Sequence, residues 1–234
     1  MDVTPEQRTY ARLAGIMFLL NYVLQGIGDS VTILSRGSAS FAETARWAAE
    51  SAVLYRVALV QVGAAWIAIG ILAFALYAVL EPVNQRLAQL ALFMRLGASF
   101  VGAASLMFRV AQARLYQASE TADLFTTEQL RTLVAVSQRA AGAGFTVAMM
   151  FMGAGSLLFF MLFLRSRYLP GALARFGVFT SALVVAMGAA MFVYPEHTNA
   201  LKAVGAPFFL TEVATALWLL FKGLPRRATA EARA

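Results

Sequence analysis

Six long, almost wholly apolar stretches dominate the sequence, and they leave few folds open to it. They run over residues 13–34, 54–80, 87–110, 142–164, 173–194 and 204–221. A helix of about 20 residues crosses the roughly 30 Å hydrocarbon layer of a bilayer, so each stretch is long enough to span a membrane. Backbone amides without partners are too costly in lipid, and the stretches lack the alternation of a β-barrel. The sequence therefore predicts an all-α integral membrane bundle with six transmembrane helices.

The composition agrees with a membrane protein. Of 234 residues, 60% are hydrophobic and 13% are charged, whereas soluble domains have about 45–50% and about 25%. The chain has no cysteine and a single histidine, His197, so thiolate metal sites, iron–sulfur clusters and bis-histidine haem cannot be built from one copy. We expect no metal and no cofactor.

The distribution of basic residues predicts the topology. The net charge is +7, but these charges lie mostly between the apolar stretches, which indicates membrane topology and not nucleic-acid binding. With the N-terminus inside, the inner segments hold ten Lys and Arg residues and the outer loops hold five. We therefore expect both termini to be cytoplasmic, with a cytoplasmic segment 1–12, a membrane domain 13–221 and a basic cytoplasmic tail 222–234.

Two outer loops carry helix-start signals. Ser40 and Glu43 have the spacing of a capping box, which predicts a short interfacial helix over 41–53. A second such signal at 126–129 precedes a proline-free run, and a helix over 127–164 would be about 57 Å long, longer than the bilayer is thick. We expect this helix to project outward by several turns.

Polar side chains inside apolar spans are the best guide to function, because a buried charge needs a partner or water. In the first span Asn21, Gln25 and Asp29 recur at helical spacing and share one stripe. The third span carries Arg95 and Arg109 on one face together with Ser99 and Gly102. Near the centre of the sixth, Glu212 lies between Thr211 and Thr215. For Arg95 and Glu212, mutual neutralisation is the cheapest arrangement, as a structural ion pair or as a ligand or proton site.

These side chains suggest an outward-facing polar pocket. It would be electropositive, and guanidinium groups favour an anionic solute or lipid headgroup. The candidate ligand-binding residues are Asp29, Arg56, Arg109, Arg139, Gln25, Gln61 and Glu212. A proton-coupled carrier with Glu212 as the titrating group is also conceivable. The simpler interpretation is that Arg56, Arg109 and Arg139 extend to the headgroups, while Asn21 and Gln25 bond neighbouring helices.

Two other classes of function remain open. A non-catalytic accessory or structural subunit would use its intramembrane charges as ion pairs, and small-residue faces such as Ala98 with Gly102 would allow homo-oligomers or a membrane partner. An intramembrane enzyme is the least favoured, because His197 lies in an outer loop and no G-x-S-x-G motif occurs. The sequence identifies no catalytic residue.

Several segments together resemble a known family. They are residues 10–15, 55–60, 76–77, 82–88, 93–96, 165–170 and 212–223, which occur in that order. The chain resembles the bacterial domain-of-unknown-function family 4386 over residues 10–223. The resemblance implies a multi-pass protein of the bacterial cytoplasmic membrane, and it carries no catalytic residues. Its motif positions include Arg56, Arg95 and Glu212.

Overall fold

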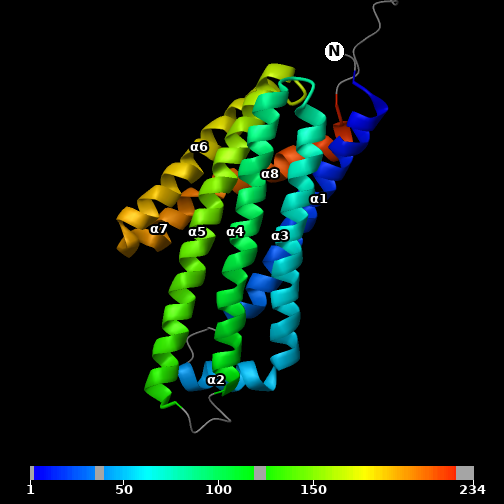
Figure 1. The fold of residues 1–234 in the computed structure, drawn as a ribbon. Coiled ribbons are helices and arrows are strands. Elements are labelled where there is room, and N and C mark those ends of the chain that lie inside the picture. Colours follow the sequence, from blue (N-terminus) through cyan, green and yellow to red (C-terminus); the bar gives the residue numbers. More distant parts are fainter. Residues whose placement is uncertain (1–2, 35–39, 119–124, 225–234) are drawn as a thin grey trace, which may run out of the picture. The chain divides into compact units, whose positions relative to one another are not determined.

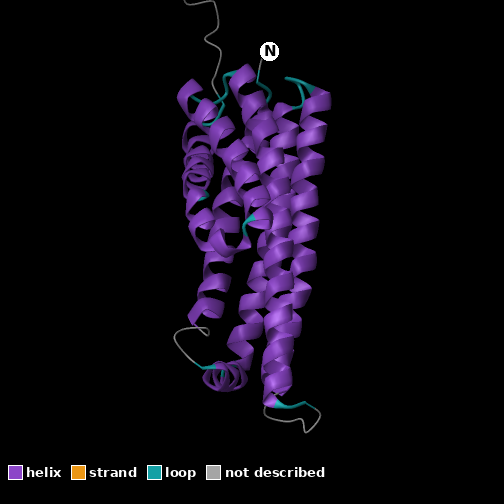
Figure 2. Ribbon diagram, turned by 90° about the vertical axis from the view of Figure 1, so that its left-hand side faces the viewer, coloured by secondary structure: helices purple, strands orange, loops and turns teal. Residues whose placement is uncertain are grey.

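The computed structural model describes residues 3–34, 40–118 and 125–224, and throughout these ranges the regular structure is helical (Figures 1 and 2). Five long helices cover the first five predicted spans to within one residue, and they are α1 (Pro5–Leu34), α3 (Ala52–Leu80), α4 (Gln85–Ala118), α5 (Thr127–Ser166) and α6 (Gly171–Val193). With the composite segment Pro195–Lys222, six helices of the described chain are long and apolar enough to cross a membrane. The prediction of an all-α membrane bundle is confirmed.

The predicted sixth span, 204–221, corresponds to the helical run over residues 206–222, and two short helical segments precede it. A 3₁₀ turn, η1 (Pro195–His197), leads into α7 (Thr198–Val204), and Gly205 separates α7 from α8 (Ala206–Leu217). Pro207 lies in the first turn of α8, where its missing N–H costs nothing. The span continues as a π-helical turn, η2 (Trp218–Lys222), and ends at Gly223, whose φ of 65° favours glycine.

Both capping boxes form. The Ser40 N–H donates to Glu43 Oε2 at 2.6 Å and the Glu43 N–H donates to Ser40 Oγ at 3.3 Å, which starts α2 (Phe41–Glu50). This helix is shorter than the predicted 41–53, because Ser51 interrupts it and α3 begins at Ala52. Thr126 and Gln129 make the same reciprocal contacts at 2.8 and 3.3 Å. The 40 residues of α5 that follow are about 60 Å long, longer than a bilayer is thick.

The chain forms two compact units. Unit 1 comprises Met1–Leu19, Ile69–Gly97 and Met149–Ala234. In its interior the Gln7 amide donates to the carbonyl of Val79 at 3.0 Å and so joins α1 to α3. A Cβ at Gly177 would overlap the ring of Phe160, so glycine is what allows α6 to approach α5 this closely.

Unit 2 comprises Leu20–Ala68 and Ala98–Ala148. Here α2 lies across one end of α3, α4 and α5 (Figure 1). Its Ala45 and Ala48 pack in one apolar cluster, whose other buried members are Tyr55, Leu59, Ala113, Tyr116 and Val134. Because this contact removes apolar surface from water, it holds α2 against the helix ends.

Candidate functional site

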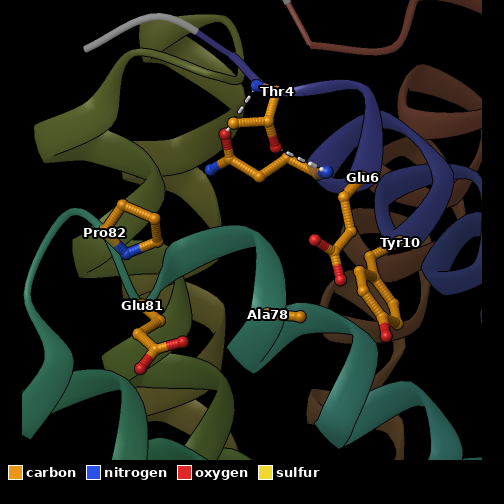
Figure 3. Close-up of a pocket in the computed structure, with 7 residues that line it drawn as sticks. Thr4, Glu6, Tyr10, Ala78, Glu81 and Pro82 are labelled. Carbon is orange, nitrogen blue, oxygen red and sulfur yellow. Dashed lines mark hydrogen bonds between the residues drawn. The ribbon is translucent and has the colours of Figure 1, made fainter.

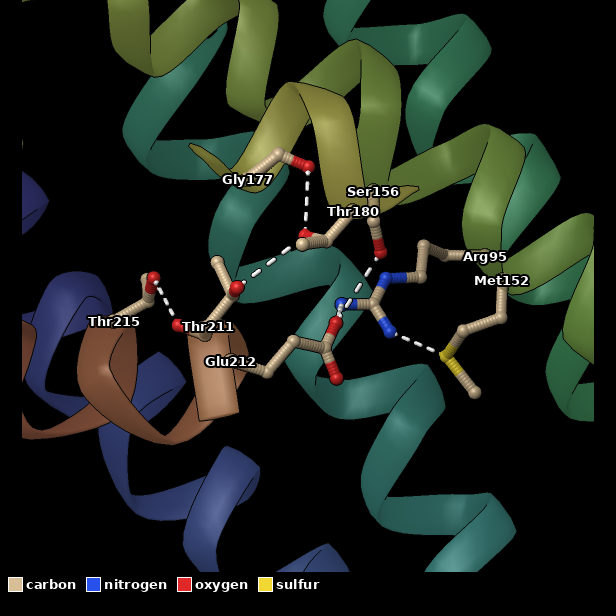
Figure 4. A network of polar contacts seen from close by, with 8 residues as sticks. All are labelled: Arg95, Met152, Ser156, Gly177, Thr180, Thr211, Glu212 and Thr215. Carbon is tan, nitrogen blue, oxygen red and sulfur yellow. Dashed lines mark hydrogen bonds and ion pairs between the residues drawn. The ribbon is translucent and has the colours of Figure 1, made fainter. Parts of the chain in front are cut away.

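The structure brings Arg95 and Glu212 together inside unit 1 (Figure 4). The Arg95 Nη2 of α4 donates to Glu212 Oε1 of α8 at 2.6 Å, and the two side chains are only 2% and 3% exposed. Ser156 of α5 donates to the same carboxylate oxygen at 3.2 Å. The charges are thus compensated by an ion pair and by a further hydrogen bond, as a buried pair requires.

The remaining contacts of the Arg95 side chain are with apolar and polarisable groups. Its Nη1 points to the sulfur of Met152, and its guanidinium lies 5.5 Å from the ring centroid of Phe18, a cation–π distance. Its buried Nε has no hydrogen-bond partner within the described part of the chain. Met152 of α5 and Phe18 of α1 thus cover the guanidinium from two neighbouring helices.

Threonine side chains extend the polar network along α8. Thr211 and Thr180 of α6 share a hydrogen bond of 3.3 Å, and Thr211 also donates to the Pro207 carbonyl at 2.7 Å. Thr215 donates to the Thr211 carbonyl at 2.9 Å. Hydroxyls that bond their own helix need no water, so these groups fit a closed helix interface.

A second ion pair lies in unit 2, and it is open. The Arg109 Nη2 of α4 is 2.9 Å from Asp29 Oδ1 of α1, and Gln25 donates to the other carboxylate oxygen at 2.9 Å. The side chains are 17% and 37% exposed. The predicted stripe of α1 therefore meets α4 through a carboxylate shared between a guanidinium and an amide.

The other predicted ligand residues of unit 2 occupy separate places. Arg56 of α3 is exposed and donates to Gln117 Oε1 at 3.3 Å. Arg139 of α5 is exposed and Gln61 of α3 is half-buried, and neither makes a hydrogen bond or ion pair within the described ranges. Glu212 belongs to unit 1, where Arg95 holds it.

Sequence reasoning missed the partners that enclose Arg95. Met152 and Ser156 are one turn apart on α5, and a hydroxyl inside an apolar span was a usable signal for Ser156. Nothing distinguishes Phe18 or Met152 from ordinary apolar packing residues. The sequence grouped Ser99 and Gly102 with Arg95 and Arg109 on one face of α4, but the structure places these two against α3. Ser99 donates to the Trp66 carbonyl at 2.6 Å, and Gly102 packs on the Trp66 ring.

The remaining titratable candidates are at the surface. His197 Nδ1 is 3.1 Å from Glu196 Oε1, and both side chains are more than half exposed. Among the described residues no group of three His, Cys, Asp or Glu side chains could hold a metal ion.

Long apolar helices with ion pairs between them define a multi-pass membrane protein. Residues 13–223 match the family described as a domain of unknown function, DUF4386, and the chain belongs to this family. Comparisons with curated proteins and with solved structures find no match.

Proposed function

We propose that this protein resides in the cell membrane and binds an anionic group at the partly exposed Asp29–Arg109 pair of unit 2, either a lipid headgroup phosphate or a small anion. The observation that carries the proposal is the contrast between the two ion pairs. The Asp29–Arg109 pair is open to its surroundings, whereas the Arg95–Glu212 pair is sealed. An anion can therefore approach the partly exposed Asp29–Arg109 pair, and Glu212 serves as the structural partner of Arg95.

The charges of the predicted ligand residues in unit 2 favour an anion. Among the predicted ligand residues of unit 2, Arg56 and Arg139 are exposed and Arg109 is 17% exposed, and Asp29 is the one carboxylate among these four. Guanidinium groups bind phosphate through paired N–H donors. An incoming phosphate can replace Asp29 on Arg109, because an ion pair at such exposure contributes little.

The position of these charges favours a headgroup. Arg109 lies one residue before the end of the predicted span 87–110, and Arg56 lies two residues after the start of 54–80. Arg139 precedes the span 142–164 by three residues. Side chains within a turn of the span boundary lie at the depth of the headgroups, where lipid phosphates are concentrated.

Thermal unfolding of the purified protein in neutral detergent tests this proposal. Ligand at about 100 times its Kd stabilises a folded protein by about 2.7 kcal/mol. We expect short-chain phosphatidylglycerol or inorganic phosphate to raise the Tm of the wild type and of Arg131→Gln, which removes an exposed arginine elsewhere on α5. Arg109→Gln and Arg139→Gln should reduce the rise.

The two ligands distinguish the source of the anion. Stabilisation by the lipid alone indicates a headgroup site, and stabilisation by both indicates a small-anion site. No stabilisation by either, or equal loss in Arg131→Gln, contradicts the proposal.

A second candidate is a non-catalytic accessory subunit, and the sealed Arg95–Glu212 pair favours it. In that account the pair only fixes the register of α4 and α8, and a partner protein supplies the activity. Charge reversal tests the structural role that both accounts give to the pair, and the anion response of the wild type distinguishes the accounts. Arg95→Glu with Glu212→Arg should retain the fold and the anion response if the pair is structural, and a lost response in a folded double variant contradicts a purely structural role.

A further inference from the structure

A groove opens in unit 1 where α1 begins and α3 ends (Figure 3). Its volume is about 460 Å³, and its lining comprises Thr4, Glu6, Gln7, Tyr10, Ala78, Glu81 and Pro82. Thr4 and Gln7 cap α1 by reciprocal hydrogen bonds of 3.0 and 3.1 Å. The Gln7 side chain also donates to the Val79 carbonyl at 3.0 Å. These bonds hold both walls, so the groove is a preformed feature.

The groove has the chemistry to bind a basic peptide. Figure 3 shows the Glu6 carboxylate beside the Tyr10 ring on one wall and Glu81 with Pro82 on the other. Glu6 is exposed and Glu81 is half-buried, with its Oε1 accepting from Gln85 at 3.1 Å. Carboxylates accept paired N–H donors from arginine, and Tyr10 and Pro82 offer apolar surface to an arginine stem.

The chain itself carries such a peptide after its last described residue, Leu224. After Leu224, residues 225–234 carry three arginines, Arg226, Arg227 and Arg233, against the single acid Glu231. These residues lie beyond the described ranges. Unit 1 contains both the groove and Leu224, the residue from which this peptide continues.

The described chain ends close enough for the peptide to reach the groove. A Cβ at Gly15 would lie 2.6 Å from Leu220 Cγ, so η2 packs directly on α1. In Figure 1 the red end of η2 lies beside the blue start of α1. Arg226 and Arg227 follow Leu224 by two and three residues, which reach about 7–10 Å at about 3.3 Å each, close to the helix diameter of about 10–12 Å that the peptide has to cross.

We propose that residues 225–234 dock in this groove, with Arg226 and Arg227 pairing with Glu6 and Glu81. The docked segment covers the junction of α1 and α3. Basic residues near a membrane also bind anionic lipid headgroups, so lipid is the competing partner for the same arginines. This proposal does not depend on anion binding by unit 2.

Disulfide trapping tests the docking, because the chain has no native cysteine. The double variants Ala78→Cys with Ala228→Cys, and Ala78→Cys with Ala230→Cys, place one thiol in the groove and one in the peptide. The matched control is Ala172→Cys with Ala228→Cys, since Ala172 is an exposed alanine at the start of α6, outside the groove. Disulfides need Cα atoms within about 7 Å.

We expect mild oxidation to cross-link at least one groove pair faster than the control pair. When Glu6→Gln and Glu81→Gln are added to the groove cysteine variant that cross-links, the cross-linking rate should fall about two- to fivefold for each ion pair lost. Added salt should lower the same rate. Equal rates in groove and control pairs overturn the proposal. So does a cross-link that forms in neutral nanodiscs and disappears in nanodiscs of phosphatidylglycerol, because lipid then holds the arginines.

The rate of thiol labelling in the groove tests the docking without requiring that a disulfide can form. In the single variant Ala78→Cys, deletion of residues 225–234 should speed reaction with a water-soluble maleimide several-fold, because the docked peptide shields the groove. The same deletion in Ala172→Cys should leave the labelling rate unchanged. An unchanged rate at position 78 overturns the docking.

Discussion

Arg95 and Glu212 are 117 residues apart in the chain, yet the Arg95 Nη2 lies 2.6 Å from Glu212 Oε1 in the interior of unit 1. The pair links α4 to α8, and Ser156 adds α5 to the same contact. A lone charge in an apolar interior costs several kcal/mol, so each partner depends on the other. The pair thereby fixes how three helices pack, and this dependence can be measured.

Removing one partner should destabilise the fold more than removing both. Glu212→Gln leaves Arg95 charged and uncompensated, and we expect a loss of about 3–5 kcal/mol in the free energy of unfolding. Arg95→Met with Glu212→Gln should recover most of it. Denaturant unfolding in detergent measures both, with Glu128→Gln at an exposed position as the control. Losses that add in the double variant contradict the coupling.

Glycine at position 155 should be needed for α5 to pack on α4. A Cβ there would lie 2.8 Å from Arg95 Cγ and 3.1 Å from the Ala91 carbonyl, so Gly155→Ala should cost about 1–3 kcal/mol. Gly142 of the same helix has open space, and Gly142→Ala should stabilise by up to about 1 kcal/mol through helix propensity. Thermal unfolding of the two variants provides the comparison, and equal effects contradict the packing.

The start of α2 should respond to acid. The hydrogen bond from the Ser40 backbone N–H, with a smaller contribution from its hydroxyl, lowers the pKa of the Glu43 carboxyl below its ordinary value of 4.5. The stabilising effect is therefore fully present above about pH 4.5 and is lost as the pH falls through the lower pKa of the folded state. Amide hydrogen exchange over residues 41–50 should lose protection in this range. Glu43→Gln should remove the pH dependence.

Neutralising Asp29 should strengthen anion binding. Asp29→Asn removes the carboxylate that competes for Arg109, and since a partly exposed pair contributes about 1 kcal/mol, affinity should rise up to about fivefold. Titration calorimetry with phosphate or short-chain phosphatidylglycerol measures the change. Weaker binding by Asp29→Asn would mean that the carboxylate positions Arg109 for the ligand.

The sequence predicts the helices well because their signals are local. Apolar length locates the spans, and Ser40 with Glu43 locates the start of α2 through neighbours three residues apart. The break at Gly205 lies at the start of the predicted span 204–221, and the helical run behind it, 206–222, differs from that span by two residues at its start and one at its end. Hydropathy reports solubility in lipid and does not report whether the backbone is continuous.

The site depends on distant contacts, which sequence alone constrains less. The pairing of Arg95 with Glu212 could be predicted from the sequence, because two opposite charges in apolar spans need compensation. The contacts of Arg95 with Met152 and Phe18 could not be predicted, because Met152 and Phe18 are ordinary apolar residues and only the packing of the helices brings them to Arg95. Likewise, Arg56 and Arg139 have the same charge as Arg109 but do not share its ion pair, because Arg56 donates to Gln117 and Arg139 is exposed.

The most direct test of the account is the accessibility of Ser156 compared with Gln138, two positions on α5. Ser156 is 1% exposed and bonds Glu212, whereas Gln138 is exposed. Ser156→Cys and Gln138→Cys are treated with a membrane-impermeant maleimide in the membrane-inserted protein, from either side. A sealed structural pair predicts labelling at position 138 and none at 156. Comparable labelling at both positions would reveal a water-filled path to Glu212 and would contradict the account.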